Sequence, residues 1–298
     1  MPSNLPPAVE APVQRTPDKR EANEVAGLDA LELGPKQVRP NPGKRIWKST
    51  WPKLAAIAIV LLVWQIVVWS EWKPIYVLPS PETVFTDLGN VITTGDFWNG
   101  VRVTMTRAFT GFLLAVVIGT VIGALVSQFA PLRAAIGSLI TGLQTMPSIM
   151  WFPLAILLFQ LSESAILFVV ILGAAPSVAN GLISGIDYVP RTWLRVGQVL
   201  GMRGFAKYRH LILPASLPSF ISGLKQGWAF SWRSLMAGEL LVIVPGALSI
   251  GVRMQQARDL SDSSLVICYI IVVLIIGIMI DVLFNAADNA LRKRWGLV

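Results

Sequence analysis

Residues 264–286 read SLVICYIIVVLIIGIMIDVLFNA, an uninterrupted apolar run with a single charged side chain, Asp281. About 20 helical residues of this kind cross a hydrocarbon core of about 30 Å. Five more stretches of similar character precede it, at residues 52–70, 107–128, 134–161, 164–186 and 217–244. We therefore predict an all-α integral membrane protein with about six transmembrane helices.

The composition of the whole chain supports a membrane protein. Hydrophobic residues make up 54% and charged residues 14% of the 298 residues, and the mean hydropathy is +0.61. Soluble domains have about 45–50% apolar and 25% charged residues. The net charge of +8 does not indicate a nucleic-acid-binding protein, because most Lys and Arg residues flank the apolar stretches. The single cysteine, Cys268, excludes a disulfide framework or a Cys-rich metal site, and we expect no metal or cofactor.

The chain is predicted to have two parts. Residues 1–46 are rich in proline and in charges of both signs, so we expect a disordered cytoplasmic tail. Residues 47–298 form the transmembrane domain, in which residues 187–216 make a long cytoplasmic loop. The third apolar stretch contains Pro147 and Pro153 and should be kinked, because proline removes a helical hydrogen bond.

The flanking charges predict the orientation in the membrane. Fifteen Lys and Arg residues flank the stretches on the side of the N-terminus, against five on the other side: Lys73, Arg102, Arg107, Arg253 and Arg258. Positive charge is concentrated in cytoplasmic loops. Both termini should therefore lie in the cytoplasm, and we expect a multi-pass protein of the bacterial inner membrane.

Two further patterns concern packing. Ser80-Pro81-Glu82 is a helix-start signal, and the apolar periodicity after it predicts a short amphipathic helix on the outer surface. Small residues recur every fourth position in the second stretch. This pattern favours close packing of another helix over a role in ligand binding; the residues are Gly111, Ala115, Gly119 and Gly123.

The fifth stretch carries an unusual number of polar residues into the membrane. Charges at membrane depth are costly unless they are paired or face water, so they indicate a substrate pathway. Arg233 is the strongest candidate. The alternatives are a structural ion pair between Arg233 and Glu239, and a Lys225 side chain that extends to the inner surface. Trp151 in the third stretch and Asn180 in the fourth would complete the pathway, whose other members are Ser222, Lys225, Gln226, Trp232, Arg233 and Glu239.

The cytoplasmic loop carries a recognisable motif. Gly201 is followed by Leu213-Pro214 and by Pro218, which resembles the EAA loop of ABC importer permeases, a coupling element that docks on the ATPase subunit. The glutamate and two alanines of that motif are replaced here by Arg195, Val196 and Gly197. The resemblance implies a coupling role for Arg195, Gly197, Gly201, Arg203, Lys207, Leu213 and Pro214.

Other segments resemble one branch of this family, the permeases of nitrate, sulfonate, taurine and bicarbonate importers. They are the residues 78–81 (LPSP), 146–154 (MPSIMWFPL) and 238–240 (GEL). The resemblance implies a type I, MetI-like bundle that works by alternating access. It also implies a second copy of the permease, an ATPase homodimer, a solute-binding protein outside the cytoplasm, and a small anion as substrate, with aliphatic sulfonate favoured.

An enzymatic role is not expected. The sequence lacks the P-loop pattern, and no nucleophile, acid–base or metal constellation stands out. The one histidine, His210, lies in the cytoplasmic loop. Two other classes remain open: a secondary transporter or channel that needs no ATPase, which would predict internal repeats, and a membrane scaffold, which would leave the polar residues of the fifth stretch unexplained.

Overall fold

The computed structural model describes residues 42–294. The chain divides into two compact units, residues 1–60 and 61–298. The described part of the first unit is the beginning of helix α2 (Pro42–Trp69), which continues into the second. Residues 1–41 of the predicted disordered tail lie outside the described residues. The last residues of that predicted tail, from Pro42 on, belong to α2.

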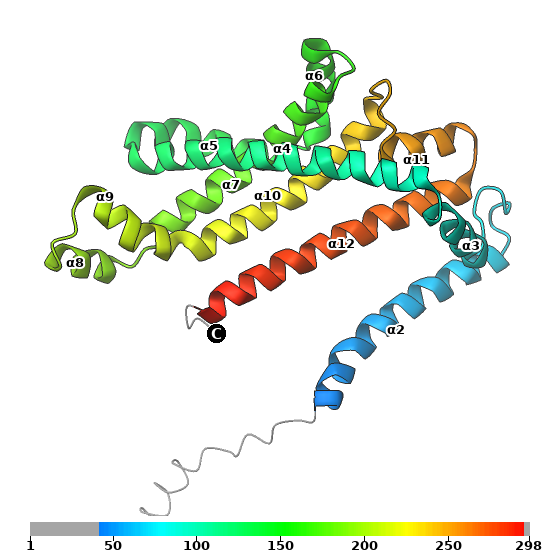
Figure 1. Cartoon of the computed structure of the whole chain (residues 1–298), viewed down its shortest axis with the longest axis horizontal. Coiled ribbons are helices and arrows are strands. Elements are labelled where there is room, and N and C mark those ends of the chain that lie inside the picture. The colour runs from blue at the N-terminus through cyan, green and yellow to red at the C-terminus, as the bar shows by residue number, and fades with distance from the viewer. Residues whose placement is uncertain (1–41, 295–298) are drawn as a thin grey trace, which may run out of the picture. The chain divides into compact units, whose positions relative to one another are not determined.

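Every regular element of residues 42–294 is helical, which confirms the all-α prediction (Figure 1). After α2 the chain forms, in order, α3 (Pro81–Ile92), α4 (Gly95–Gln128), α5 (Ala130–Thr145), the 3-10 turn η1 (Ser148–Trp151), α6 (Phe152–Phe159), α7 (Glu163–Asp187), α8 (Arg191–Val199), α9 (Gly204–Lys207), the π-helical turn η2 (Tyr208–Ile212), α10 (Leu213–Leu241), α11 (Ile250–Asp259) and α12 (Ser263–Arg294).

Each of the six predicted stretches coincides with a long helix or with a bent pair of helices. Within the described residues, α2, α4, α7 and α12 are long and apolar enough to cross a membrane, and α5 with η1 and α6 adds a fifth crossing if the bent pair counts as one. Helix α10 has 29 residues. It is long enough to span, but its charged and other polar side chains lower its mean hydropathy below that of the other spanning helices.

The third stretch is broken rather than kinked. Its two halves, residues 130–145 and 148–159, meet at 104° (Figure 1). The break lies at Pro147, which pushes Met146 into an extended conformation, with φ −80° and ψ 130°. The prediction of a distortion is right at Pro147 and wrong at Pro153, because Pro153 sits in the first turn of α6, where no helical N–H is needed.

Small residues bring α4, α7 and α10 into close contact, as predicted. A Cβ on Gly119 would lie 2.5 Å from the Ala175 carbonyl oxygen of α7, and one on Gly111 would lie 2.7 Å from Val170. Helix α10 approaches α7 just as closely, because a Cβ on Gly223 of α10 would lie 2.7 Å from the Cα of Gly181. No side chain larger than that of glycine fits at these helix crossings, so α4, α7 and α10 pack closely against one another.

Helix α4 begins earlier than predicted. Thr94 caps its first turn by accepting a hydrogen bond from the Phe97 N–H at 3.3 Å, and the helix then runs from Gly95 through Arg102 and Arg107. Hydropathy alone places the start at residue 107 and makes Arg107 a flanking charge. In the structure the Arg107 side chain is instead 5% exposed and lies inside the helical unit.

The predicted helix after Ser80 is α3. Ser80 caps it through the Thr83 N–H at 3.3 Å. The apolar face of α3 is not free: Val84 and Leu88 are buried, and the Cys268 thiol of α12 donates to the Val84 carbonyl oxygen at 3.3 Å. This helix is therefore fixed against α12 by its apolar face.

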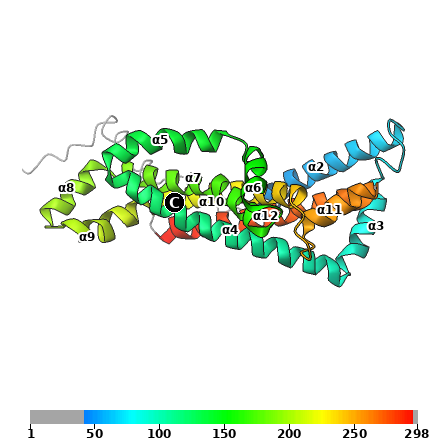
Figure 2. The same ribbon diagram turned by 90° about the horizontal axis from the view of Figure 1, so that it is seen from above.

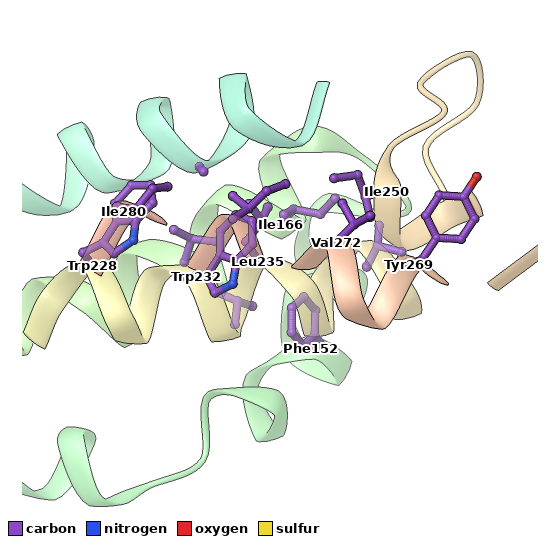
Figure 3. Packing of buried hydrophobic residues seen from close by; sticks show 14 of the residues in the cluster. Phe152, Ile166, Trp228, Trp232, Leu235, Ile250, Tyr269, Val272 and Ile280 are labelled. Atoms are coloured by element: carbon purple, nitrogen blue, oxygen red, sulfur yellow. The ribbon is translucent and has the colours of Figure 1, made fainter. Parts of the chain in front are cut away.

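The largest apolar cluster of the described residues has members on α3, α4, α6, α7, α10, α11 and α12, and Figure 3 shows part of it. The indoles of Trp228 and Trp232 on α10 stack with their centroids 6.4 Å apart. Phe152, at the start of α6, packs beside Gly238 of α10, where a Cβ would come within 3.0 Å of its ring. Helix α6, although short, is thus anchored in the core by its first residue.

The segment between α7 and α10 forms two short helices, α8 and α9, at one end of α7 and α10 (Figures 1 and 2). Gly201 ends α8 with φ +74°, and the Met202 N–H donates to the Gly197 carbonyl oxygen at 2.8 Å. The Gly201 N–H donates to the Gln198 carbonyl oxygen at 3.0 Å. These two bonds form a Schellman motif, whose left-handed position favours glycine.

Candidate functional site

Helix α10 borders two hollows, and its residue Arg233 lines both of them. The first is a partly open cavity of about 310 Å³ at the break between α5 and η1, lined also by residues of α7 and α10. Arg233 and Trp151, both predicted pathway residues, line it together with Gln144, Ser148 and Phe230. The broken third stretch and the polar helix α10 therefore meet at one place.

Arg233 is the only cationic residue among those lining this cavity. Its Nε donates to the Ala229 carbonyl oxygen at 3.0 Å, and its guanidinium carbon lies 4.9 Å from the centre of the Phe230 ring. Among the described residues no carboxylate forms an ion pair with it. The two terminal nitrogens are thus available to an anion, and a planar guanidinium can hold an oxyanion by two parallel hydrogen bonds.

The polar wall of the cavity is fixed by hydrogen bonds from α7 and α10. The Ser234 hydroxyl donates to the Ser148 hydroxyl oxygen at 2.8 Å. The Gln144 amide donates to Ser177 at 3.1 Å and accepts from the Asn180 amide at 3.2 Å. Asn180, a predicted pathway residue, does not line the cavity; it orients Gln144, which does.

The second hollow is a groove of about 860 Å³ between α10 and α12. Five predicted pathway residues line it, namely Ser222, Lys225, Gln226, Trp232 and Arg233. Most of the polar residues that the sequence places in the fifth stretch therefore border one groove. Arg233 lines both this groove and the cavity at the helix break.

The Lys225 end of the groove is neutralised within the chain. The Lys225 ammonium donates to the Asn285 side-chain oxygen at 2.7 Å and lies 3.2 Å from the Asp281 carboxylate. Asp288 borders the same end. Lys225 therefore satisfies its charge with α12, and Asp288 is itself paired with Arg292 at 2.9 Å.

Glu239 lies apart from both hollows. Its carboxylate is fully buried and accepts hydrogen bonds from Arg107 Nη1 at 3.0 Å, Thr104 Oγ1 at 2.9 Å and the Gly251 N–H at 3.1 Å. The alternative interpretation, an ion pair between Arg233 and Glu239, is not the arrangement in the structure. Glu239 instead connects α10 to α4 and to the first turn of α11, where the helix dipole favours a negative charge.

Arg107 also binds Glu163, at the start of α7, through its Nε and Nη2 atoms. The Glu163 side chain is 45% exposed, so this half of the cluster is open to solvent. Sequence reasoning missed this Arg107 cluster, formed by Thr104, Arg107, Glu163 and Glu239. Arg107 itself could have predicted the cluster. It lies one turn before the small residues of α4, which pack closely on another helix, and a guanidinium buried there needs a carboxylate partner.

The predicted coupling residues fall into three groups in the structure. Arg195 is exposed on α8, whereas Gly197 is buried, with Leu211 so close that a Cβ would lie 2.9 Å from it. Arg203 and Lys207 border a surface hollow of about 440 Å³ beside Gly204. Leu213 and Pro214 form the first turn of α10 and line a mostly apolar hollow of about 630 Å³ with α4 and α7.

Helix α8 presents an apolar surface to its surroundings. Trp193, Val196, Val199 and Leu200 are all at least half exposed. Residues at such spacings share one side of a helix, and an exposed apolar surface of this kind usually marks a contact with a partner. The cationic side chains of Arg191 and Arg195 are exposed on the same helix.

Comparison with known sequences gives a consistent result. Residues 111–293 match a protein family described as binding-protein-dependent transport system inner membrane component. The nitrate import permease protein of Synechocystis sp. is 29% identical over 235 residues, which cover 76% of this chain and 83% of that protein. The putative aliphatic sulfonates transport permease protein of Bacillus subtilis is 27% identical over 257 residues, 86% of this chain and 91% of that protein.

The fold is also similar to a solved one. A chain of the MetNI methionine ABC transporter, in an inward-facing conformation, superimposes with a TM-score of 0.57 and 16% identity. The match covers 66% of this chain and 96% of that chain. At this identity the similarity concerns the fold, and it agrees with the MetI-like helical bundle expected from the sequence.

Proposed function

The chain belongs to the family of binding-protein-dependent transport system inner membrane components, and we propose that it lines the path by which an ATP-driven importer moves a small anion into the cytoplasm. The favoured substrate is an aliphatic sulfonate, followed by nitrate, taurine and bicarbonate. Two similar permeases are named for nitrate and for aliphatic sulfonates, and their identities to this chain differ by too little to rank the two.

Arg233 is the observation that carries the anion assignment. Its guanidinium lines the cavity at the broken stretch, and within residues 42–294 its two terminal nitrogens have no partner. An unpaired charge in a membrane protein is tolerated when it faces water or a ligand. In our proposal Arg233 holds the anionic group while Trp151 and Gln144 shape the wall, with Asn180 orienting Gln144. Ser222, Gln226, Trp232 and the neutralised Lys225 continue the path along α10.

The α8–α9 segment is the proposed contact with the ATPase. Its apolar surface is exposed, its basic residues suit an acidic partner, and the Gly201 turn fixes the angle between its two short helices. ATP hydrolysis takes place on that separate subunit. Arg195, where related loops carry glutamate, would meet an acidic rather than a basic contact on this partner.

The remaining parts of the assembly follow from the same proposal. Two copies of the permease and two ATPase subunits form the complex in the bacterial inner membrane, with both termini of the permease in the cytoplasm. A solute-binding protein delivers the anion to the opposite side. Alternating access arises when closure of the ATPases moves the α8–α9 segments and, through them, α7 and α10.

Transport by purified protein tests this proposal. The permease is reconstituted in liposomes with the ATPase and binding protein of its own system, and uptake of methanesulfonate, nitrate, taurine and bicarbonate is measured with and without ATP. We expect ATP-dependent uptake of at least one anion and none of a neutral alcohol of the same size. Uptake that needs no ATPase would favour a secondary transporter, and the absence of uptake for every anion would contradict the proposal.

A further inference from the structure

The last turn of α5 leaves the backbone carbonyl oxygens of residues 143–145 without a hydrogen-bond donor. In a continuous helix they would accept from the N–H groups of residues 147–149. Pro147 has no N–H, and the two halves of the third stretch meet here at 104°. No N–H or O–H group of residues 42–294 donates to these oxygens. Carbonyl groups at membrane depth need water or a ligand as a donor when the protein supplies none.

Nearby side chains of the described residues have other partners. The Thr145 hydroxyl donates one turn back within α5, and the Gln144 amide donates to the Ser177 hydroxyl oxygen at 3.1 Å. The Arg233 guanidinium, which lines the same cavity, donates to the Ala229 carbonyl oxygen instead. The carbonyl end of α5 is therefore open to a ligand that donates hydrogen bonds.

The carbonyl end of α5 and Arg233 border the same cavity. Seven consecutive residues, 143–149, line this cavity, so the backbone of the break forms part of its wall. The C-terminal end of a helix carries a partial negative charge, whereas Arg233 contributes a positive charge. Nitrate has no hydrogen to donate and can bind only at the positive part. A molecule that carries both an anionic and a cationic group fits both parts.

We propose that the carbonyl end of α5 is an ammonium-binding subsite, and that the transported molecule is a zwitterion whose sulfonate group binds at Arg233. This inference rests on the anion-transport function proposed above. An ammonium group has three N–H donors, and the carbonyl oxygens of residues 143–145 need donors. The subsite ranks an aminoalkanesulfonate such as taurine above alkylsulfonates, nitrate and bicarbonate. The similarity to permeases named for nitrate and for aliphatic sulfonates does not give this order.

Taurine and isethionate are the probes that test this subsite. Both carry a sulfonate on an ethyl chain, and they differ only at the other end, which is an ammonium group in taurine and a hydroxyl group in isethionate. Their affinities are measured on the complex of permease and ATPase in lipid nanodiscs, without the binding protein, so that its own selectivity does not enter. Hydrogen bonds from a charged donor are roughly twice as strong as neutral ones, so taurine should bind at least about tenfold more tightly.

Pro147→Ala removes the feature that leaves these carbonyls open, and Pro153→Ala is its matched control. Alanine restores an N–H that can donate to the Leu143 carbonyl oxygen, so the preference for taurine over isethionate should fall several-fold. Pro153 lies in the first turn of α6, where no helical N–H is needed, and it does not line the cavity. Pro153→Ala should therefore keep the wild-type preference.

Thr145→Lys is a second variant, at a side chain that is already exposed, and it is useful if Pro147→Ala fails to assemble. A lysine in the last turn of a helix can donate to the last carbonyl oxygens, so its ammonium group competes with that of taurine. Taurine affinity should fall at least about tenfold. Isethionate affinity should not fall, because an added positive charge attracts an anion. Thr145→Met, with a neutral side chain of similar length, should keep the wild-type preference.

Equal affinities of the wild-type complex for taurine and isethionate would overturn the subsite and would leave water as the donor to these carbonyls. An unchanged preference for taurine in an assembled Pro147→Ala or Thr145→Lys complex would also overturn it. If the wild-type complex binds nitrate or methanesulfonate but neither probe, the subsite is wrong and anion transport stands. Failure to transport any anion is a different result, because it contradicts the proposed function itself.

Discussion

At the scale of single residues, the buried carboxylate of Glu239 organises the packing of three helices. It has no contact with water and depends on Arg107, Thr104 and the first turn of α11. The sequence indicated that Glu239 was unusual but could not name its partner, because Arg107 is 132 residues away. Only the fold brings the two together, and their pairing leaves Arg233 without a carboxylate partner among the residues that the structure describes.

Removing Arg107 should therefore destabilise the protein strongly. Arg107→Gln leaves a buried carboxylate without its counter-charge, which costs about 3–5 kcal/mol when one partner of a buried pair is lost. Adding Glu239→Gln should recover much of that loss, because the neutral amide can still bond to Thr104. The comparison is made by thermal unfolding of the purified permease in detergent.

Glu163→Gln is the control for this prediction. The Glu163 side chain is 45% exposed, and Arg107 keeps its buried partner Glu239 in this variant. The unfolding temperature of Glu163→Gln should therefore fall much less than that of Arg107→Gln. If Arg107→Gln unfolds at the wild-type temperature, or if the double variant is less stable than Arg107→Gln alone, Glu239 is not held in the way described.

At the scale of elements, local signals in the sequence located most helices, and long-range contacts decided the rest. Ser80 marked the start of α3, and Pro147 marked a distortion in the third stretch. The size of the bend, 104°, was not predictable, because it depends on Phe152 packing beside Gly238 of a distant helix. The start of α4 was missed for a similar reason: buried partners allow charged residues to continue a helix that hydropathy would end.

The Gly201 turn gives a prediction at this scale. A Cβ at position 201 would meet no atom within 4 Å, so a substitution there acts through the backbone, whose φ is +74°. Valine in a left-handed conformation costs about 1–2 kcal/mol or more, whereas asparagine tolerates it. Gly201→Val should therefore insert and assemble but lose the coupling of ATP hydrolysis to uptake, and Gly201→Asn should stay close to wild type.

Both quantities are measured on the same reconstituted complex, as binding-protein-stimulated ATPase activity and as uptake per ATP hydrolysed. Wild-type values of both in Gly201→Val would show that the α8–α9 segment does not depend on this turn for coupling. Equal defects in the Val and Asn variants would point to the side chain rather than to the backbone conformation.

At the scale of the whole molecule, the family and the helical fold followed from motifs whose order and spacing agree, such as the residues 146–154 and the Gly201 loop. The substrate did not follow. Its selection depends on which side chains of separate helices converge, and sequence placed Trp151 and Arg233 in a pathway without showing that they share a cavity. The groove beside Arg233 was not foreseen either, because it is formed jointly by α10 and α12.

The most direct test of the account is the uptake of the transported anion by Arg233→Gln. Arg233→Lys, which keeps the positive charge, is measured for comparison. Arg233 is exposed and forms no ion pair among the described residues, so both variants should assemble and unfold like the wild type. Loss of a charge-assisted hydrogen bond to the anion costs about 1.5–3 kcal/mol, so uptake by Arg233→Gln should fall at least about tenfold, with partial retention in Arg233→Lys. Wild-type uptake by an assembled Arg233→Gln complex would contradict the central claim that this guanidinium binds the anion.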